Sequence, residues 1–578
     1  MADRPNILWF VSEDCAPHGK ALGDGLAHTP TIDRLATEGV VYDNAFSTYP
    51  VCAPSRFSII SGVHAQSCGP AHHMRSAPPF PPGLTTYPQV LRAAGYHCTN
   101  NAKTDYNCDL DPAVVWDESS ERAHWSQAPQ GKPFLAVFNC NRTHESALFR
   151  EDIGPVSPAE VRVPAYLPDT DEIRADFARY YTAVEAMDRE FAVRLRELED
   201  AGVLDDTVVL YSSDHSGVAP WTKRFCHDQG LRVPLVIWAP PRWQHLLPSA
   251  PGTRITAPVT HIDIAPTLIA LGGAEVPVSM QGTSLLAGSM RRYAFGARDR
   301  MDERYDMVRT VRGERYRYIR NYAPHRPTGQ HLAYAWQAAG YRSWEEAHRA
   351  GTLPPVQRRF FEPKSAEELY DTMADPDHLV NLIDEPAAAE RVAAMRIALD
   401  EFILRTGDMG FIPDGLSVED YPLPEVMVLA ELAITRSPAN RTAFAAALGN
   451  TNAVVRYWGA QGMLMLGPEA SAADLVPVLD DPCAQVRIAT AEALIHVGLA
   501  ALGVARLVGE LAGPPRVRLQ AVNALTYAGA AAAEALPHLE PLTEDDDTYV
   551  RSAARYLVWS LRGEYMPSSP VFTRKGTA

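Results

Sequence analysis

Residues 51–56 (VCAPSR) bring together residue types that could do chemistry. Cys52 is a potential nucleophile at the start of a predicted helix, and Arg56 adds a cation one turn further on. With 8 cysteines, 47 prolines and at most 53 arginines, a Cys-x-Pro-x-Arg pattern is expected by chance about 0.06 times. Taken alone, the pattern leaves open that Cys52 is only a buried cysteine at a helix start.

Two pairs of metal-binding residue types each follow an apolar run that is typical of a buried strand. They are Glu13-Asp14 and Asp214-His215. Because the carboxyl ends of parallel strands meet at one edge of a sheet, the four side chains are expected to converge. Three carboxylates and one imidazole would bind a divalent cation, which would also hold an oxygen of the nucleophile and of the substrate. In isolation, an acidic pair after a strand is more often a loop or a helix cap.

The elements that must position these side chains form an α/β pattern over residues 1–290. The predicted strands cover residues 6–12, 133–138, 207–213 and 233–238, and the predicted helices cover residues 30–37 and 171–201. Thr29 is the expected cap of the first helix, and Gly39 its stop. Strands alternating with helices predict a mostly parallel central sheet covered on both faces.

From about residue 291 to 415 the pattern changes to a smaller α+β unit. Residues 307–322 alternate like a β-hairpin with Gly313 at the turn, which predicts an antiparallel sheet. A helix near 387–406 closes this unit.

Residues 416–565 contain a repeat. Val-Arg pairs recur with a period of 31 to 33 residues, each before an alanine-rich amphipathic stretch, at Arg456, Arg487, Arg518 and Arg551. This period predicts an α-solenoid similar to HEAT repeats, and an irregular helical bundle is the alternative. We expect the helices to pack as a separate unit without a catalytic residue, forming a subunit contact in a homo-oligomer or one wall of the substrate cleft. Residues 566–578 have the composition of a loose tail.

Composition excludes several classes of function. Hydrophobic residues make up 46% of the 578 residues and charged residues 21%, as in ordinary globular enzymes. The formal net charge of -17 argues against a nucleic acid or an anionic membrane as partner. No signal peptide or transmembrane run is recognisable, so the expected location is cytoplasmic. The eight cysteines are scattered and do not indicate a disulfide framework.

The segment from Arg4 to Gly62 resembles the type I, formylglycine-dependent sulfatases of the alkaline-phosphatase superfamily. The matching residues are Pro5-Asn6-Ile7, the acidic pair, His28-Thr29-Pro30, Asp33, Leu35, the CxPSR motif and Ser61-Gly62. The resemblance extends to about residue 405 and is nearest to the N-sulfoglucosamine sulfohydrolase (sulfamidase) branch. It implies an alkaline-phosphatase-like fold and a small-molecule or saccharide sulfate as substrate. It also implies that a formylglycine-generating enzyme oxidises Cys52 to formylglycine.

The resemblance also implies roles for further residues. Arg56 would hold the aldehyde hydrate, while Lys103 and Lys223 match the lysines that bind sulfate. His144 matches the active-site histidine and is the candidate that protonates the leaving group. One calcium ion is implied, with Glu13, Asp14, Asp214, His215 and the residue-52 side chain as its ligands. The imidazole gives manganese as an alternative.

The sequence departs from the family pattern after Lys103. The family has a histidine two residues on, which is thought to remove a proton during sulfate release, whereas this chain has Asp105. Asp105 could serve as the base or could be structural. His72 or His73 could reach in instead, and His73 is also a candidate for substrate binding.

The predicted function is hydrolysis of a sulfate ester or sulfamate. Two alternatives remain open from the sequence. A phosphonate monoester hydrolase or phosphodiesterase uses the same scaffold, often with an Asp-His metal pair, as at Asp214-His215. A catalytically silent scaffold protein is the other alternative, disfavoured by the nearly complete set of catalytic residue types.

Overall fold

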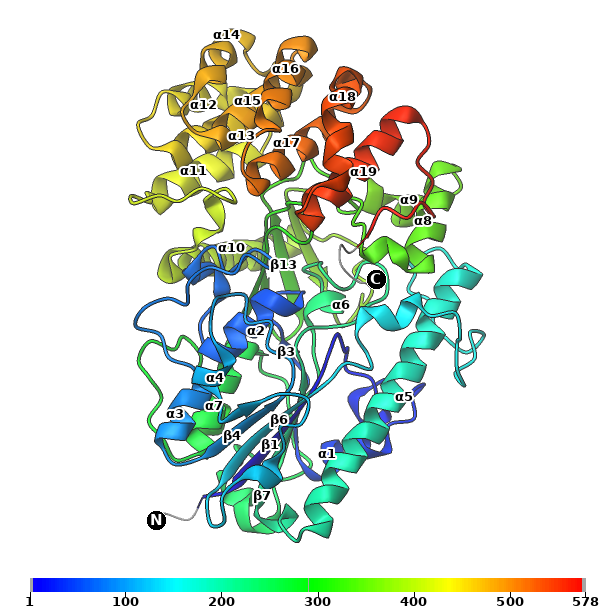
Figure 1. Cartoon of the computed structure of the whole chain (residues 1–578), viewed down its shortest axis with the longest axis vertical. Coiled ribbons are helices and arrows are strands. Elements are labelled where there is room, and N and C mark those ends of the chain that lie inside the picture. Colours follow the sequence, from blue (N-terminus) through cyan, green and yellow to red (C-terminus); the bar gives the residue numbers. More distant parts are fainter. Residues whose placement is uncertain (1–3, 289–290, 574–578) are drawn as a thin grey trace.

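The computed structural model describes residues 4–288 and 291–573. A mixed sheet of eight strands forms the lower part of the molecule in Figure 1. In spatial order the strands are β5 (Glu118–Ser119), β4 (His97–Asn101), β6 (Phe134–Cys140), β1 (Asn6–Ser12), β7 (Thr207–Ser213), β8 (Leu235–Trp238), β2 (Val40–Tyr42) and β9 (Arg254–Ile255). From β5 to β7 all neighbours are parallel, so the prediction of a mostly parallel centre is confirmed.

The alternation of side chains along β1 builds two cores. Leu8 and Phe10 pack in the core under α1 (Pro30–Glu38) and α5 (Asp171–Asp200). Ile7, Trp9 and Val11 point to the other face, where α3 (Tyr87–Ala93) and α7 (Ile264–Leu271) lie. Figure 1 shows these two helical layers on opposite sides of the sheet. Since helices cover both faces of the sheet, a site is expected at the carboxyl ends of the strands.

Two local predictions need correction. The strand predicted at 233–238 is β8, and it runs antiparallel to β7, so the sheet is mixed. Thr29 occupies the N-cap position of α1, but its side chain makes no capping hydrogen bond. Asp188 of α5 caps the helix instead: its Oδ2 accepts from Thr31 N at 3.2 Å and its Oδ1 from Ile32 N at 2.9 Å. A carboxylate on the neighbouring helix thus replaces the local cap.

A smaller antiparallel sheet lies between the eight-stranded sheet and the C-terminal helices (Figure 1). Its order is β11 (Ala294–Arg298), β12 (Val308–Arg312), β13 (Tyr316–Asn321) and β14 (Glu367–Asp371). The predicted hairpin is β12–β13, with Gly313 N bonded to Tyr316 O at 3.0 Å. The predicted closing helix is α10 (Ala389–Thr406).

The C-terminal region is helical, as Figure 1 shows at the top. The longer helices are α11 (Leu423–Ile434), α12 (Arg441–Leu448), α13 (Ala453–Leu466), α15 (Ala484–His496), α16 (Ala500–Glu510), α17 (Pro515–Ala528) and α19 (Thr548–Arg562). The four recurring Val-Arg pairs fall in the first turns of α13, α15, α17 and α19, and these helices contact one another in that order.

The recurring arginines share one structural task. Arg487 Nη1 donates to Asp481 O at 2.7 Å, while its other nitrogens pair with Glu510. Arg456 makes the same combination with Thr451 O and Asp481. Each arginine thereby ties the start of its helix to the preceding loop, which explains the sequence period. The classification as HEAT-like repeats stays a prediction.

The C-terminal helices do not pack as a separate unit. One hydrophobic core runs from Val311 and Tyr318 of the small sheet through α10 to α19. The described part of the expected loose tail is also packed: Val571, together with Tyr565, lies against Ala333. No helix in the described ranges is long and apolar enough to span a membrane.

We predict that Asp188→Ala lowers the free energy of unfolding by about 1–2 kcal/mol, because two backbone N–H groups of α1 lose their acceptor. Asp188→Asn retains an acceptor oxygen and should lose less. Urea denaturation of the two variants beside the unmodified chain measures the effect. Equal midpoints for all three proteins would contradict this account of the cap.

Candidate active site

The two predicted metal-binding pairs meet where β1 and β7 end. Ser12 and Ser213 are neighbours in the parallel register, so the residues after them leave the sheet side by side. Asp14 N donates to Asp214 Oδ1 at 3.1 Å. The predicted convergence of the strand ends is therefore what the structure has.

Cys52 lies against these pairs at the first position of α2 (Cys52–Ser61), whose residues are all buried. Its Sγ is 3.3 Å from His215 Nε2, 3.6 Å from Asp14 Oδ1 and 3.8 Å from Lys223 Nζ. A helix N-terminus with free N–H groups favours negative charge at this position. The residue-52 side chain is thus placed among acidic, basic and imidazole groups at once.

Four buried side chains form a donor set for a cation. One ligand atom from each of Asp14, Cys52, Asp214 and His215 lies within 4.8 Å of the other three. His215 Nδ1 donates to Ser216 O at 2.8 Å, which leaves Nε2 as the ligand atom of the neutral ring. Two carboxylates, an imidazole and an oxygen or sulfur at residue 52 fit a divalent ion.

Glu13 stands apart from this donor set. Its Oε2 accepts from Lys103 Nζ at 2.8 Å, and its Oε1 lies 3.9 Å from Arg56 Nη2. The carboxylate is 4% exposed, so the Lys103 ion pair is largely shielded from water. Its role as a metal ligand stays a prediction.

The two lysines that are expected to bind sulfate, Lys103 and Lys223, lie close enough to interact with Cys52, as does Arg56. Lys223 Nζ lies 2.6 Å from Asp14 Oδ2 and 2.9 Å from Glu145 Oε1. Arg56 Nε donates to Asp214 Oδ2 at 2.9 Å. With no cation bound, burial disfavours the charged form of His215, but Asp14 and Asp214 outweigh it and raise its pKa to about 10, whereas a divalent ion held between these carboxylates would favour the neutral ring.

His144 lines the same cavity as Cys52. Its Nδ1 faces Ser146 Oγ at 3.0 Å, which orients the ring. Burial lowers the pKa of His144, although Asp14 acts in the opposite direction. A negatively charged substrate beside the ring would raise that pKa and favour a proton on it.

Three other predicted residues do not join this cavity. His72 and His73 line a different cavity of about 350 Å³ together with Asp414, and His73 Nε2 lies 3.8 Å from Asp414 Oδ1. Asp105 is half-buried in the left-handed backbone region, with φ 47°. None of the three is among the residues that line the cavity of Cys52.

An ion-pair chain missed by the sequence analysis supports the site. Arg224 is 1% exposed; its Nη1 and Nη2 donate to Glu145 at 2.8 and 3.0 Å, and its Nε donates to Asp302 Oδ2 at 2.5 Å. Burial opposes ionisation of Glu145, but Arg224 and Lys223 lower its pKa to about 2. Glu145 directly follows His144 and Arg224 directly follows Lys223, so the sequence could have indicated these two residues, whereas nothing in it indicated Asp302.

The cavity above Cys52 has a volume of about 500 Å³, within the usual range for small-ligand sites. Lys103, His144 and Lys223 line it on the catalytic side. The remaining wall comes from distant parts of the chain, namely Arg75, Asp302, Tyr334, Arg516, Asp546, Asp547, Thr548, Tyr549 and Phe572. The C-terminal helices therefore wall the cavity, as one of the alternatives from the sequence predicted.

Comparison with known proteins gives consistent matches. Residues 5–274 match the family model described as Sulfatase. An "Ulvan-active sulfatase" from Formosa agariphila is 33% identical over 467 residues, which cover 72% of this chain and 77% of that protein. The human "N-sulphoglucosamine sulphohydrolase" is 24% identical, over 72% of this chain and 93% of that protein.

Two solved structures share the fold. A "2-O GAG sulfatase" has a TM-score of 0.55 and 18% identity, covering 72% of this chain and 95% of its own. The phosphonate monoester hydrolase of Agrobacterium radiobacter has a TM-score of 0.53 and 17% identity, covering 72% and 100%. The fold is thus common to both reaction classes and does not separate them.

We predict that Arg224→Met lowers the free energy of unfolding by about 3–5 kcal/mol, because Glu145 and Asp302 are left as buried carboxylates with a cation removed. Adding Asp302→Asn removes one of the two charges and should recover part of the loss. Chemical denaturation of the single and double variants measures this coupling. Additive losses in the double variant would contradict the proposed ion-pair chain.

Proposed function

The chain belongs to the sulfatase family, a group of sulfuric ester hydrolases, and from this premise we propose that it hydrolyses a saccharide sulfate ester or sulfamate by means of a formylglycine made from Cys52. The observation that carries the proposal is the position of the Cys52 side chain. It lies at a helix start, within 3.3–3.8 Å of His215, Asp14 and Lys223, and opens into a cavity. Two relatives are named for ulvan and for N-sulphoglucosamine, which supports a saccharide as the substrate.

Formylglycine supplies, as its hydrate, one hydroxyl that attacks sulfur and a second whose deprotonation expels sulfate. Lys103, Lys223 and Arg56 bind the sulfuryl oxygens and stabilise the charge that develops on them. His144 gives a proton to the leaving oxygen or nitrogen. The first turn of α2 adds its N–H groups to the binding of the anion. A dedicated formylglycine-generating enzyme is required for maturation.

Asp14, Asp214, His215 and the residue-52 side chain would hold a divalent cation, which would polarise the oxygens bound to it. Calcium is the proposed ion. Manganese is the alternative, because the imidazole of His215 is a softer ligand than the oxygen ligands that calcium prefers. The arrangement supports Asp105 more than His72 or His73 as the base of the release step. Asp105 is one of the charges acting on Arg56, whereas both histidines open into another cavity.

The second candidate function is hydrolysis of a phosphonate monoester or phosphodiester. The imidazole at His215 beside Asp214 is the observation that favours it. Turnover of 4-nitrophenyl sulfate compared with bis(4-nitrophenyl) phosphate separates the two. We expect kcat/KM to be at least about 10-fold higher for the sulfate, and the reverse order would establish the phosphodiesterase.

We predict that Cys52→Ser and Cys52→Ala abolish multiple turnover of 4-nitrophenyl sulfate, because neither side chain offers both a nucleophile and a route to release. Both variants should keep the fold, since the replacements are small. Steady-state kinetics and a thermal melt measure the two properties. Multiple turnover by the serine variant at a tenth or more of the normal rate would refute the proposed nucleophile.

We predict that Asp214→Ala loses the metal, because it removes one of the two carboxylates of the donor set. Elemental analysis of the purified protein, with calcium and manganese measured separately, is the readout. Glu13→Gln is the matched comparison: we expect it to weaken metal binding less, since this carboxylate pairs with Lys103. A full metal complement in Asp214→Ala would contradict the site.

A further inference from the structure

The wall opposite the catalytic residues is built from the starts of two C-terminal helices. Arg516 is the second residue of α17, and Asp547 is the N-cap of α19, with Tyr549 in its first turn. All three line the cavity into which Cys52 opens. If the sulfate of a substrate lies at Cys52, the leaving group, which is the saccharide, would therefore extend toward this wall.

Charge in the cavity is unevenly compensated. The cations beside Cys52 are all paired with carboxylates: Lys103 with Glu13, Lys223 with Asp14 and Glu145, Arg56 with Asp214, and Arg224 with Glu145 and Asp302. Arg75, by contrast, is exposed to the cavity and forms no hydrogen bond or ion pair within the described residues, although Tyr549, Asp105 and Asp302 lie near enough to raise its pKa against the effect of burial.

Arg516 is only partly compensated. Its Nη2 donates to Asp547 Oδ2 at 3.2 Å, whereas its Nη1 is buried without a partner in the described ranges. Burial and the neighbouring Arg300 lower the pKa of Arg516, as expected of a cation with too little negative charge around it. Buried guanidinium N–H groups without acceptors are unfavourable, and an anion would satisfy them.

Tyr549 lies close to three arginines, Arg516, Arg300 and Arg75. Its ring centroid lies 5.6 Å from Arg516 Cζ and 5.3 Å from Arg300 Cζ, and Arg75 is one of the charges acting on its hydroxyl. The hydroxyl is itself buried with no partner in the described ranges. The wall thus offers an aromatic ring, an unused hydroxyl and two guanidinium groups.

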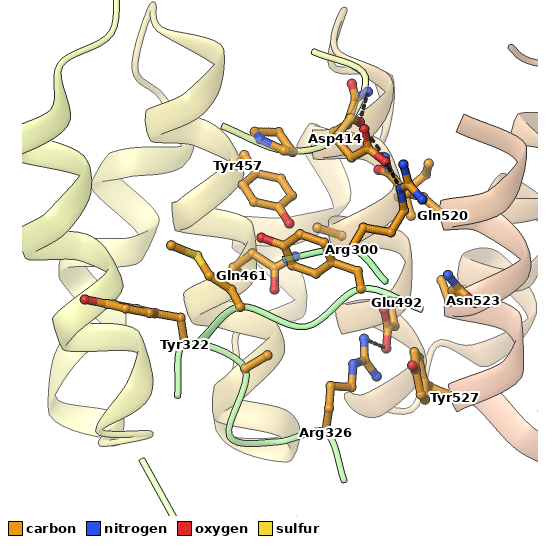
Figure 2. A pocket seen from close by; sticks show the side chains of 18 of the residues that line it. Arg300, Tyr322, Arg326, Asp414, Tyr457, Gln461, Glu492, Gln520, Asn523 and Tyr527 are labelled. Atoms are coloured by element: carbon orange, nitrogen blue, oxygen red, sulfur yellow. Dashed lines mark hydrogen bonds and ion pairs between the residues drawn. The ribbon is translucent and has the colours of Figure 1, made fainter. Parts of the chain in front are cut away.

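The wall is held firmly by residues beneath it. Arg300 Nη2 donates to Met74 O at 2.8 Å, next to Arg75, and its Nε donates to Asp414 Oδ2 at 2.5 Å. Gln520 of α17 donates to Asp414 O at 2.6 Å. Figure 2 shows Arg300, Asp414 and Gln520 together at the edge of a neighbouring small cavity, where Arg326 and Glu492 form a separate ion pair. One arginine therefore sets the positions of the Arg75 loop and of α17.

Building on the proposed function, we propose that this wall is a leaving-group subsite for an acidic saccharide, in which Arg75 and Arg516 bind a second anionic group of the substrate and Tyr549 contacts the sugar. The second group is a carboxylate of a uronic acid or a further sulfate, since each presents at least two negatively charged oxygens that one guanidinium group can bind together. The C-terminal helices thereby determine specificity without supplying the reacting groups.

The test uses monosulfated disaccharides that differ in sulfate position. Each is supplied with its uronic acid intact, with that carboxylate reduced to an alcohol, and in the reduced form with a second sulfate. For the disaccharide hydrolysed best, we expect the acidic form to exceed the reduced form at least about 10-fold in kcat/KM. Arg75→Gln and Arg516→Gln should each reduce this preference by about 10-fold, whereas Tyr549→Phe should lower kcat/KM for both forms by a few-fold, because Tyr549 contacts the sugar that they share. If the second sulfate restores the kcat/KM of the reduced form, the subsite binds a sulfate. If it does not, the subsite requires the carboxylate.

Arg518→Gln is the matched control. Arg518 lies two residues further along α17 and forms the corresponding ion pair with Asp545, but it does not line the cavity. It should leave the preference unchanged. Equal hydrolysis of the acidic, reduced and doubly sulfated forms, an unchanged preference in Arg516→Gln and Arg75→Gln, or hydrolysis of 4-nitrophenyl sulfate but of no disaccharide would overturn the proposal.

Binding separates this proposal from the proposed function. Calorimetric titration of Cys52→Ala with the same disaccharides needs no turnover, and we expect it to favour the acidic form by at least about 10-fold in Kd. If the protein with its natural sequence, converted to formylglycine at Cys52, hydrolyses no sulfate, the proposed function fails. The binding preference of Cys52→Ala still decides the subsite. If hydrolysis proceeds and binding shows no preference, only the subsite fails.

Discussion

The Lys223 ammonium between Asp14 and Glu145 is the interaction on which the site depends. Its Nζ lies 2.6 and 2.9 Å from the two carboxylates, in a place with almost no access to water. Without this cation, two acidic groups would face each other inside the protein, where unpaired charges are strongly unfavourable. The same ammonium is 3.8 Å from Cys52 Sγ, so the charge that compensates these carboxylates also faces the proposed nucleophile. If the proposed mechanism holds, both the stability of the site and the binding of sulfate require a cation at residue 223.

Further ion pairs, in which acidic and basic side chains alternate, extend outward from Glu145. Glu145 also contacts Arg224, and Arg224 contacts Asp302 on the loop between β11 and β12. The next residues of that loop hold the C-terminal helices: Asn523 of α17 bonds to Glu303 O at 2.8 Å and also contacts Arg304. A continuous set of polar contacts thus runs from the strand ends to α17. It explains why the helices share a core with the small sheet instead of packing alone.

The sequence predicted those features that have a local cause. Apolar runs identified β1 and β7 with their full bounds, and the residues after them then had to meet because parallel strands end together. The direction of β8 was not predictable, since a four-residue apolar strand carries no sign of its orientation. Asp188 caps a helix 156 and 157 residues away, and Arg224 joins residues 79 and 78 positions distant, so only the fold reveals them. The period of the arginines predicted the helices and left a wall of the cleft as one alternative for them, but it did not indicate which helix starts reach the cavity.

The central claim is that residue 52 acts as formylglycine, and mass spectrometry of the peptide that contains it tests this most directly. The modified fraction should be measured across preparations made with different amounts of a formylglycine-generating enzyme, and the concentration of active sites determined on the same samples. The account predicts a proportional relation that passes through zero, with no turnover from chains that retain the thiol. Full activity in a preparation in which Cys52 is entirely unmodified would contradict it.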